Sequence, residues 1–295
     1  MKNHFKIFAV VAATVMTIGT IVLVSCNKES QASSQEQSGM MTNSIEESPF
    51  DYIGETHNQL LFLIGKNLSE DISDYVQLEY KTEESRDSLI EKISSTAALI
   101  MKDIAFPNIS LSEMENLIDS AFIMADGDDF ESSNVANSIE KIFNKYQGIS
   151  SLDDLQLAIR STELDMTRST MSATDSQVVA CLNIYYHSMN FWKDATFNEN
   201  NPWHVLIYDI NNNPNSYIFN TTKRVNLKNW LKKAGDWFHS TFQHLKEKYT
   251  WEKIALADLY GAGLGAGLAI SNPVVGPSAI VISGTAMSAV GPLFM

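Results

Sequence analysis

The chain carries no charged side chain after Asp258, although the protein as a whole is strongly acidic. Within this tail, Gly261, Gly263, Gly265 and Gly267 alternate with apolar residues. Glycine in a helix is about 1 kcal/mol less favourable than alanine, so four of them in one helix need a compensating interaction. Their spacing gives two overlapping GxxxG pairs, which let a second helix approach the backbone closely. The tail is therefore predicted to be helical and close-packed.

The partner of this glycine-rich segment would be AIVISGTAMSAV at 279–290, which follows a turn at SNPVVGPS, 271–278. The matching small-residue face would consist of Ala279, Ser283, Ala286 and Ala289 or Val290. Residues 251–295 are accordingly expected to form an apolar helical hairpin that packs on the rest of the protein. Insertion of the tail into a bilayer and a secreted, toxin-like action are the alternatives. The apolar run at 254–270 is about 17 residues long and contains an aspartate, which is marginal for a hydrocarbon core of roughly 30 Å.

Residues 49–250 are predicted to form an α-helical domain, because apolar side chains recur there three and four positions apart. Three of the sets are Leu89, Ile93, Ala97, Ile100 and Ile104; Met114, Leu117, Ile118 and Ala121; and Val135, Ile139, Ile142, Phe143 and Tyr146. No alternation of strands with helices and no fixed-period repeat is visible. We therefore expect a mainly α fold, a multi-helix bundle of six to eight helices with the glycine-rich hairpin at its C-terminal end.

Helix start signals agree with this pattern. Ser110 precedes Glu113 and Ser151 precedes Asp154 at capping-box spacing, so side-chain oxygens are available for the unpaired N–H groups of a first turn. Further helices are expected near 174–195, with Val178, Cys181, Leu182, Tyr185 and Met189 inward, and near 226–248, with Leu227, Trp230, Leu231, Ala234, Trp237, Phe238 and Leu245 inward. The exception is VLIYDINNNPNSYIF at 205–219, where two β-prone runs flank an Asn and Pro cluster, so a small hairpin or an irregular loop is expected.

The N-terminus has the pattern of a secretion signal. Lys2 and Lys6 precede the uncharged run IFAVVAATVMTIGTIVLVS at 7–25, and residues 1–25 are predicted to be removed as a signal peptide. The sequence LVSC at 23–26 resembles the lipobox of bacterial lipoproteins. The resemblance implies that Cys26 becomes the first mature residue and carries acyl chains such as palmitate, so that a lipid bilayer is its partner. The alternative is an uncleaved transmembrane anchor with an incidental cysteine.

Residues 26–48 are predicted to be a lipidated, flexible tether, because they are rich in Ser, Gln and Glu and almost free of large apolar side chains. Lys28 and Glu29 weakly resemble the charged export signals of Bacteroidota surface lipoproteins, and Asn27 stands where an acidic residue would retain a lipoprotein in the inner membrane. We therefore expect a lipid-anchored protein at the outer membrane or cell surface of a Gram-negative bacterium.

The net charge of the mature chain limits the kinds of partner that we expect it to bind. Removal of residues 1–25 takes away two lysines and no acids, which leaves 19 basic and 35 acidic residues and a formal charge of −16. Nucleic acid is excluded as an expected partner, because phosphate binding needs a clustered positive surface. Cys181 is the second cysteine and is expected to pack in the core, since no intramolecular disulfide can form once Cys26 is acylated.

The segment SPFDYIGETHNQLL at 48–61 opens the helical domain. Its Gly54, His57 and Asn58 resemble the Gly-x-x-His-Asn opening motif of uncharacterised Bacteroidota lipoproteins, and WEKIALADLYGAGLGAGLAI at 251–270 resembles the Trp-Lys, Ala-Asp and Gly-rich segment that closes that family. Ser48 stands where the family usually has Asn. The family has no established activity. Glu55 and His57 are candidates for an acid/base or metal pair, but turn and capping roles for the motif are the preferred interpretation.

No catalytic, metal or cofactor site is predicted. His239 and His244 are five positions apart and cannot share a helix face, and His187 and His204 have no ligand spacing. The stretches at 124–131 and 209–220 imitate calcium loops but lack the glycine and glutamate register of an EF-hand. We therefore expect a non-catalytic lipoprotein that binds an envelope protein or glycan. The alternative is an antagonistic effector, bacteriocin-like or pore-forming, that acts through the C-terminal tail.

Overall fold

The computed structural model describes residues 48–126, 133–146, 149, 151–213, 250–271 and 278–294, and these ranges contain ten α-helices and no strand. In chain order they are α2 (Asp51–Asn67), α3 (Ser69–Gln77), α4 (Glu83–Ile100), α5 (Leu111–Asp126), α6 (Asn134–Asn144), α7 (Leu152–Thr167), α8 (Ala173–Phe197), α9 (His204–Asn212), α11 (Thr250–Ser271) and α12 (Ser278–Val290). A π-helical turn, Met101–Ala105, follows α4, and a 3₁₀ turn, Gly291–Phe294, follows α12. The predicted mainly α fold is confirmed. The described helices outnumber the six to eight expected.

The predicted helix starts are present. The Ser110 backbone N–H donates to Glu113 Oε2 at 2.9 Å, and the Glu113 N–H donates to Ser110 Oγ at 3.2 Å, which is a complete capping box for α5. At the start of α7, Ser151 Oγ accepts a bond from the Asp154 N–H at 3.4 Å. The long helix α8 starts with another complete box, at Ser172.

The predicted apolar stripes face the core with two exceptions. Their members on α4, α5, α6 and α8 are buried, except that Tyr146, just after α6, is only half-buried. Ile104 was expected inward but is 46% exposed. It lies in the π-helical turn, where the wider coil rotates the following side chains away from the face that α4 presents to the core.

The small hairpin or irregular loop expected at 205–219 is wrong for the first half of this stretch. This half belongs to α9, in which Leu206, Ile207 and Ile210 are buried at three- and four-residue spacing. The β propensity of single residues is therefore overridden by packing on one helical face. Residues 214–219, the expected helix at 226–248 and the N-terminal residues through 47, including Cys26, lie outside the described residues.

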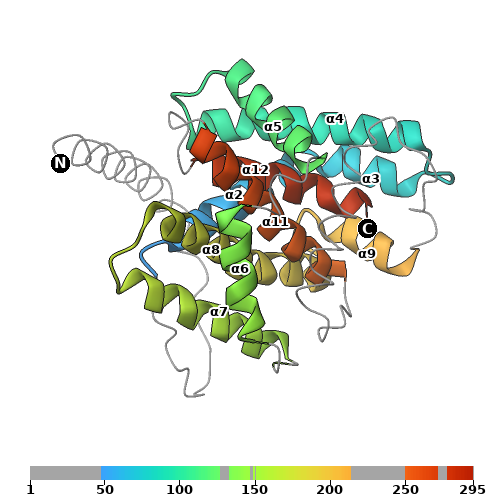
Figure 1. Cartoon of the computed structure of the whole chain (residues 1–295). Coiled ribbons are helices and arrows are strands. Elements are labelled where there is room, and N and C mark those ends of the chain that lie inside the picture. Colours follow the sequence, from blue (N-terminus) through green and yellow to red (C-terminus); the bar gives the residue numbers. More distant parts are fainter. Residues whose placement is uncertain are drawn as a thin grey trace, which may run out of the picture.

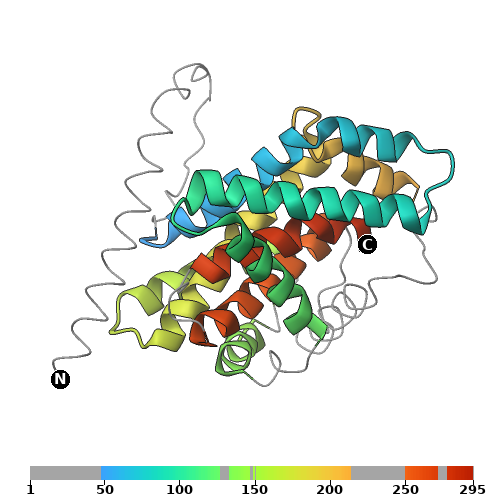
Figure 2. The ribbon, with the colours of Figure 1, turned by 90° about the horizontal axis from the view of Figure 1, so that it is seen from above.

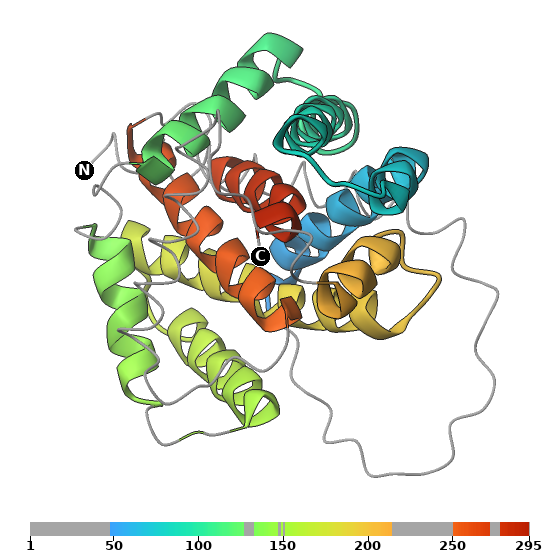
Figure 3. The same ribbon diagram turned by 90° about the vertical axis from the view of Figure 1, so that its right-hand side faces the viewer.

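The C-terminal helices α11 and α12 lie side by side as an antiparallel hairpin at the centre of the bundle (Figures 1 and 3). Helix α8 packs along α11, and α2, α4 and α5 cover α12. Figure 2 shows α4 and α5 lying across the hairpin on one side. Every residue from Ala279 to Val290 is buried, as is α11 from Ile254 to Ala266. The predicted glycine-rich hairpin thus supplies the middle of the core.

Two of the four tail glycines make the close approach of the hairpin possible. A Cβ atom placed on Gly261 would lie 2.7 Å from the Cβ of Met287, and one on Gly265 would lie 2.6 Å from the Cα of Ile280 and would also overlap the Ala279 carbonyl. Both distances are below normal van der Waals contact. Gly263 is buried and Gly267 half-buried on the same helix. The first predicted GxxxG pair therefore forms the helix contact.

No helix in the described part of the chain combines the length and the hydropathy that a bilayer crossing requires.

We predict that Gly265→Ala destabilises the protein by about 1–3 kcal/mol, because the added methyl group overlaps backbone atoms of α12 that cannot rotate away. The measurement is the free energy of unfolding in denaturant. Gly284→Ala, also within the hairpin, is the matched control. Its Cβ would meet Ile184 Cδ1 at 3.4 Å, so it should be neutral or stabilising by up to about 1 kcal/mol. Equal effects of the two variants would contradict the close-contact interpretation.

Candidate functional site

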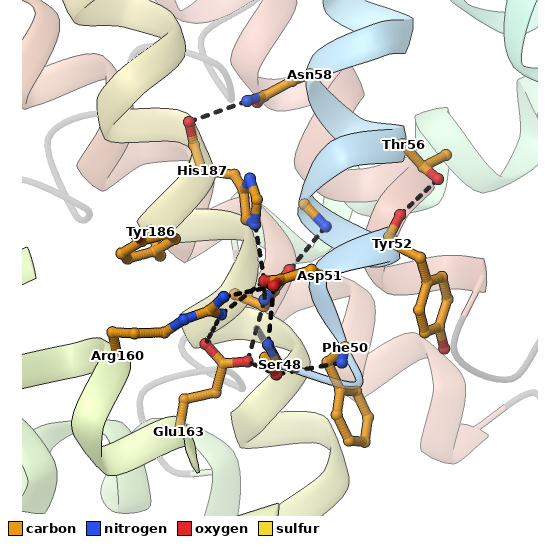
Figure 4. A network of polar contacts seen from close by, with 12 residues as sticks. Ser48, Phe50, Asp51, Tyr52, Thr56, Asn58, Arg160, Glu163, Tyr186 and His187 are labelled. Carbon is orange, nitrogen blue, oxygen red and sulfur yellow. Dashed lines mark hydrogen bonds and ion pairs between the residues drawn. The ribbon is translucent and has the colours of Figure 1, made fainter. Parts of the chain in front are cut away.

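Polar and charged side chains from three helices meet where the described part of the domain begins (Figure 4). Asp51 is the first residue of α2, Arg160 and Glu163 lie on α7, and Asn183 and His187 lie on α8. We call these five residues together with Ser48 the entry cluster. Glu163 and Asn183 are completely buried, and Asp51 and His187 are partly exposed.

Arg160 joins the two carboxylates of the entry cluster. Its Nη1 donates to Asp51 Oδ1 at 2.6 Å and to Glu163 Oε2 at 3.1 Å, and its Nη2 donates to Asp51 Oδ2. The pairing with Asp51 is therefore bidentate, the strongest geometry for a guanidinium and a carboxylate. The Tyr186 ring lies against the guanidinium, with its centroid 4.7 Å from Cζ, and adds a cation–π contact.

The oxygens of Asp51 are fully used. Besides Arg160, they accept bonds from the Ser48 backbone N–H at 2.8 Å and from Asn183 Nδ2 and His187 Nε2, each at 3.0 Å. Burial alone would raise the pKa of the Asp51 carboxyl. The hydrogen bonds from Arg160, and then those from His187, Ser48 and Asn183, outweigh burial and hold this pKa well below its usual range.

Glu163 is engaged in the same way. Its Oε1 accepts bonds from Ser48 Oγ and from Asn183 Nδ2 at 3.1 Å, and its Oε2 accepts from Arg160. Burial alone would lower the pKa of Arg160, but its hydrogen bonds to Asp51 and the charge of Glu163 outweigh burial and raise this pKa, so the guanidinium stays charged. Each carboxylate oxygen of the cluster thus has a partner within the protein. A general base needs a lone pair directed at a substrate. The five bonds to Asp51 leave none there, and Glu163, which accepts three bonds, is completely buried.

The turn and capping roles preferred for the opening motif are wrong, because Gly54, His57 and Asn58 all lie inside α2. The motif instead joins α2 to α8. The Gly54 backbone N–H donates to Asn183 Oδ1 at 2.8 Å, and a Cβ atom on Gly54 would lie 2.7 Å from this oxygen and overlap the His187 ring. Asn58 Nδ2 donates to the His187 carbonyl oxygen at 3.0 Å. Gly54 permits the close approach of the two helices and Asn58 fastens it.

His57 is completely buried between α2 and the hairpin. Burial lowers the pKa of His57 to about 4, opposed by its bond to Asn58 and by the Gly284 backbone of α12. Glu55 is exposed on the other side of α2. The candidate acid/base or metal pair of Glu55 and His57 is therefore not formed, because two positions along a helix separate the side chains by about 200°.

A second buried carboxyl, Asp258 of α11, lies at the junction of α8, α11 and α12. Its Oδ2 accepts bonds from Ser188 Oγ and from Trp192 Nε1, the latter at 2.8 Å, and Ser288 of α12 lies close to the carboxyl. Burial raises the pKa of Asp258 from 3.8 to about 7, although all three neighbours favour the ionised form. No ion pair in the described part of the chain includes Asp258.

The other cysteine, histidine and calcium-loop candidates from the sequence lie as follows in the structure. Cys181 is buried in the core, and burial raises the pKa of its thiol. His204 bonds the Ala195 carbonyl at 3.1 Å. His239 and His244 lie outside the described residues, as do most of 124–131 and the second half of 209–220, whose first four residues are helical. Within the described ranges no three His, Cys, Asp or Glu side chains are grouped to hold a metal ion.

The entry cluster was not found from the sequence. Arg160 and Glu163 were detectable in principle, because they stand three apart on the face of α7 that also carries the buried Leu155 and Ile159. Charged residues on an otherwise inward face indicate buried partners. These partners are identified only by the tertiary structure. Asp51 lies 109 positions from Arg160 in the sequence, and Asn183 lies 20 positions from Glu163.

The arrangement defines an all-α protein with a glycine-packed central hairpin and a closed, buried polar cluster at the domain entry. No protein-family model, no curated protein and no solved structure matches this chain.

We predict that Arg160→Met lowers the free energy of unfolding by about 3–5 kcal/mol, because it leaves Asp51 and Glu163 buried without a cation. Denaturant unfolding measures this loss. Arg168→Met, on the exposed pair with Asp165 just after α7, should change stability by no more than about 0.5 kcal/mol.

The acid dependence of stability gives a second readout of the entry cluster. The folded-state pKa of Asp51 is lowered from 3.8, so its stabilisation is complete above that value and is lost as the pH falls below it. The wild type should therefore lose stability below about pH 4, and Arg160→Met should lose less in that range. An identical acid dependence in both proteins would refute this assignment.

Proposed function

We propose that this chain is a lipoprotein, attached through acylated Cys26 to the outer membrane or surface of a bacterial cell, whose helical body binds an envelope protein or glycan without catalysis. Two or three acyl chains, each buried CH₂ contributing about 0.8 kcal/mol, give a stable anchor. The short polar stretch 27–48 then provides the distance between the bilayer and the domain.

The observation that carries this proposal is the burial of the α11–α12 hairpin. The hairpin is the part of the mature chain best suited by composition to meet lipid, and its apolar side chains instead contact α2, α4, α5 and α8. The residues from Ile254 to Ala266 and from Ala279 to Val290 are buried, so these parts of the hairpin offer no apolar surface to a bilayer. Attachment to the membrane is therefore left to the acylated N-terminus, which agrees with the resemblance of positions 23–26 to a lipobox.

The entry cluster also supports this proposal, because it holds the residue at which the proposed tether ends. Ser48 is the last residue of the tether segment and is bonded through its backbone N–H to Asp51 and through its hydroxyl to Glu163. A body held by a flexible N-terminal segment needs such a fixed point, because thermal motion of the tether would otherwise fray the first turn of α2. Ser48 is itself buried.

A non-catalytic role is supported by the five hydrogen bonds that Asp51 accepts, by the complete burial of Glu163 and by the separation of Glu55 from His57. The formal charge of −16 for residues 26–295 disfavours nucleic acid and anionic headgroups as partners of the body.

We predict that growth with an alkyne-labelled fatty acid labels the wild-type protein and that Cys26→Ala abolishes the label. The variant should also retain residues 1–25, because the thiol is the acceptor that precedes cleavage. Cys181→Ala is the matched control and should keep the label, since that thiol is fully buried. In-gel fluorescence and intact mass measure both effects. Unmodified sulfur at position 26 in the wild type would exclude the proposal.

The alternative, an effector acting through the tail, gives the opposite result when the tail is removed. Deletion of 261–295 should abolish cooperative unfolding, because it removes core residues that contact α2, α5 and α8. Deletion of 27–47 should leave the unfolding transition in place. A folded truncation, together with leakage of dye-loaded vesicles caused only by the longer protein, would favour the effector.

A further inference from the structure

Among the hairpin residues whose burial the structure describes, Asp258 is the one charged residue in the core, and it lies where three helices meet. Trp192 and Ser188 of α8 both donate to the same carboxyl oxygen, Oδ2. The other oxygen, Oδ1, has no hydrogen-bond partner of good geometry, although the Ser288 hydroxyl of α12 lies close to the carboxyl. One side chain therefore connects α11 to both of its main neighbours and has one oxygen unused.

We propose that Asp258 is a proton-controlled latch, which holds the α11–α12 hairpin against α8 when its carboxyl is neutral and loosens this contact when the carboxyl is ionised. With a proton on Oδ1, the carboxyl donates to the nearby Ser288 hydroxyl while Oδ2 keeps its two donors. Without the proton, a full negative charge stands in the core with Oδ1 unsolvated. This arrangement penalises the ionised, closed state.

Within the described ranges, the helices around Asp258 supply no buried cation to offset that charge, and Lys253 of α11 itself is exposed. Helix α12 and the 3₁₀ turn Gly291–Phe294 have no charged residue. On α8, Lys193 and Asp194 are exposed, Asp175 caps the N-terminus and His187 bonds Asp51. On the other neighbours, Glu113, Glu115, Asp119, Glu140 and Lys141 are exposed, and Asp209 of α9 pairs with Lys81. Ser188, Trp192 and Ser288, all uncharged, remain as the groups that act on the carboxyl.

The direction of the pH dependence follows from the two states. In the closed hairpin burial raises the pKa of Asp258 to about 7, whereas in an opened hairpin it returns toward 3.8. Opening therefore releases a proton, and its equilibrium constant rises about tenfold per pH unit between pH 4 and 7 and is constant above that. His57 works in the opposite direction, since burial lowers its pKa to about 4, so acidification below 6.5 favours opening if α2 separates as well.

The test is amide hydrogen exchange of the full-length protein in detergent between pH 5 and 8, corrected for intrinsic rates. Wild type is compared with Asp258→Asn, which keeps the size and an acceptor oxygen but does not ionise. Because His57 titrates in both proteins, their ratio isolates Asp258. We expect protection of the α11 amides in the wild type to fall, relative to the variant, about tenfold per unit up to pH 7. Asp119→Asn, at an exposed site on α5, should behave as wild type.

A second readout is made on the wild-type protein, and a variant is needed only to assign the resonance. The Trp192 indole N–H bonds directly to Asp258, so its ¹H–¹⁵N resonance, assigned with Trp192→Phe, should titrate with a midpoint near pH 7. A Trp192 resonance that is constant from pH 5 to 8 would overturn the proposal, as would equal exchange profiles for wild type and Asp258→Asn.

Discussion

The contact between the backbones of α11 and α12 is the constraint on which the rest of the fold depends. At Gly261 and Gly265 the missing side chains bring Met287 and Ile280 within reach of main-chain atoms, so the two helices form one thin, apolar slab. A slab of this kind has two faces that both need cover. Helix α8 covers one side along α11, and α2, α4 and α5 cover α12. The helices α2, α4 and α5 are amphipathic because each has one side on this slab and one in water.

A glycine serves the same purpose once more at the beginning of the domain. Gly54 lets α2 approach Asn183 and His187 of α8 so closely that its own N–H reaches the Asn183 side chain. Asp51, one turn earlier, is thereby placed between Arg160 and His187. The short distance between α2 and α8 thus creates the entry cluster. The cluster in turn fixes the first turn of α2 through its bonds to Ser48.

The parts of the structure that could be predicted from the sequence are those with local or periodic causes. The hairpin followed from glycine spacing, the stripes on α4, α5, α6 and α8 from helical periodicity, and the start of α5 from Ser110 and Glu113. Where a prediction was wrong, the structure depends on an irregular helical turn or on packing against distant parts of the chain. Ile104 is exposed because of a π-helical turn, and α9 is helical because Leu206, Ile207 and Ile210 bury one face.

The entry cluster and the surroundings of Asp258 could not be predicted from the sequence for a different reason. No local pattern pairs Asp51 with Arg160 or Asp258 with Trp192, since these contacts arise only after α2, α7, α8 and the hairpin have packed. The opening motif was visible as a resemblance, but its physical meaning was not. Gly54 and Asn58 act on α8, and His57 lies under the hairpin, so the three neighbours in sequence serve two different interfaces.

Asp258, which is fully buried, and Asp51, which is partly buried, show how hydrogen-bond partners decide the pKa of a carboxyl that is removed from water. Burial raises the pKa of both. Asp51 has a bidentate guanidinium and three further donors, and its pKa falls, so ionisation stabilises the folded protein there. Asp258 has only uncharged donors, and its pKa rises to about 7, so ionisation opposes folding there. Ionisation of a carboxyl therefore raises the stability of the bundle at the domain entry and lowers it at the centre. A change of pH near neutrality reaches only the central one, because the pKa of Asp51 lies far below.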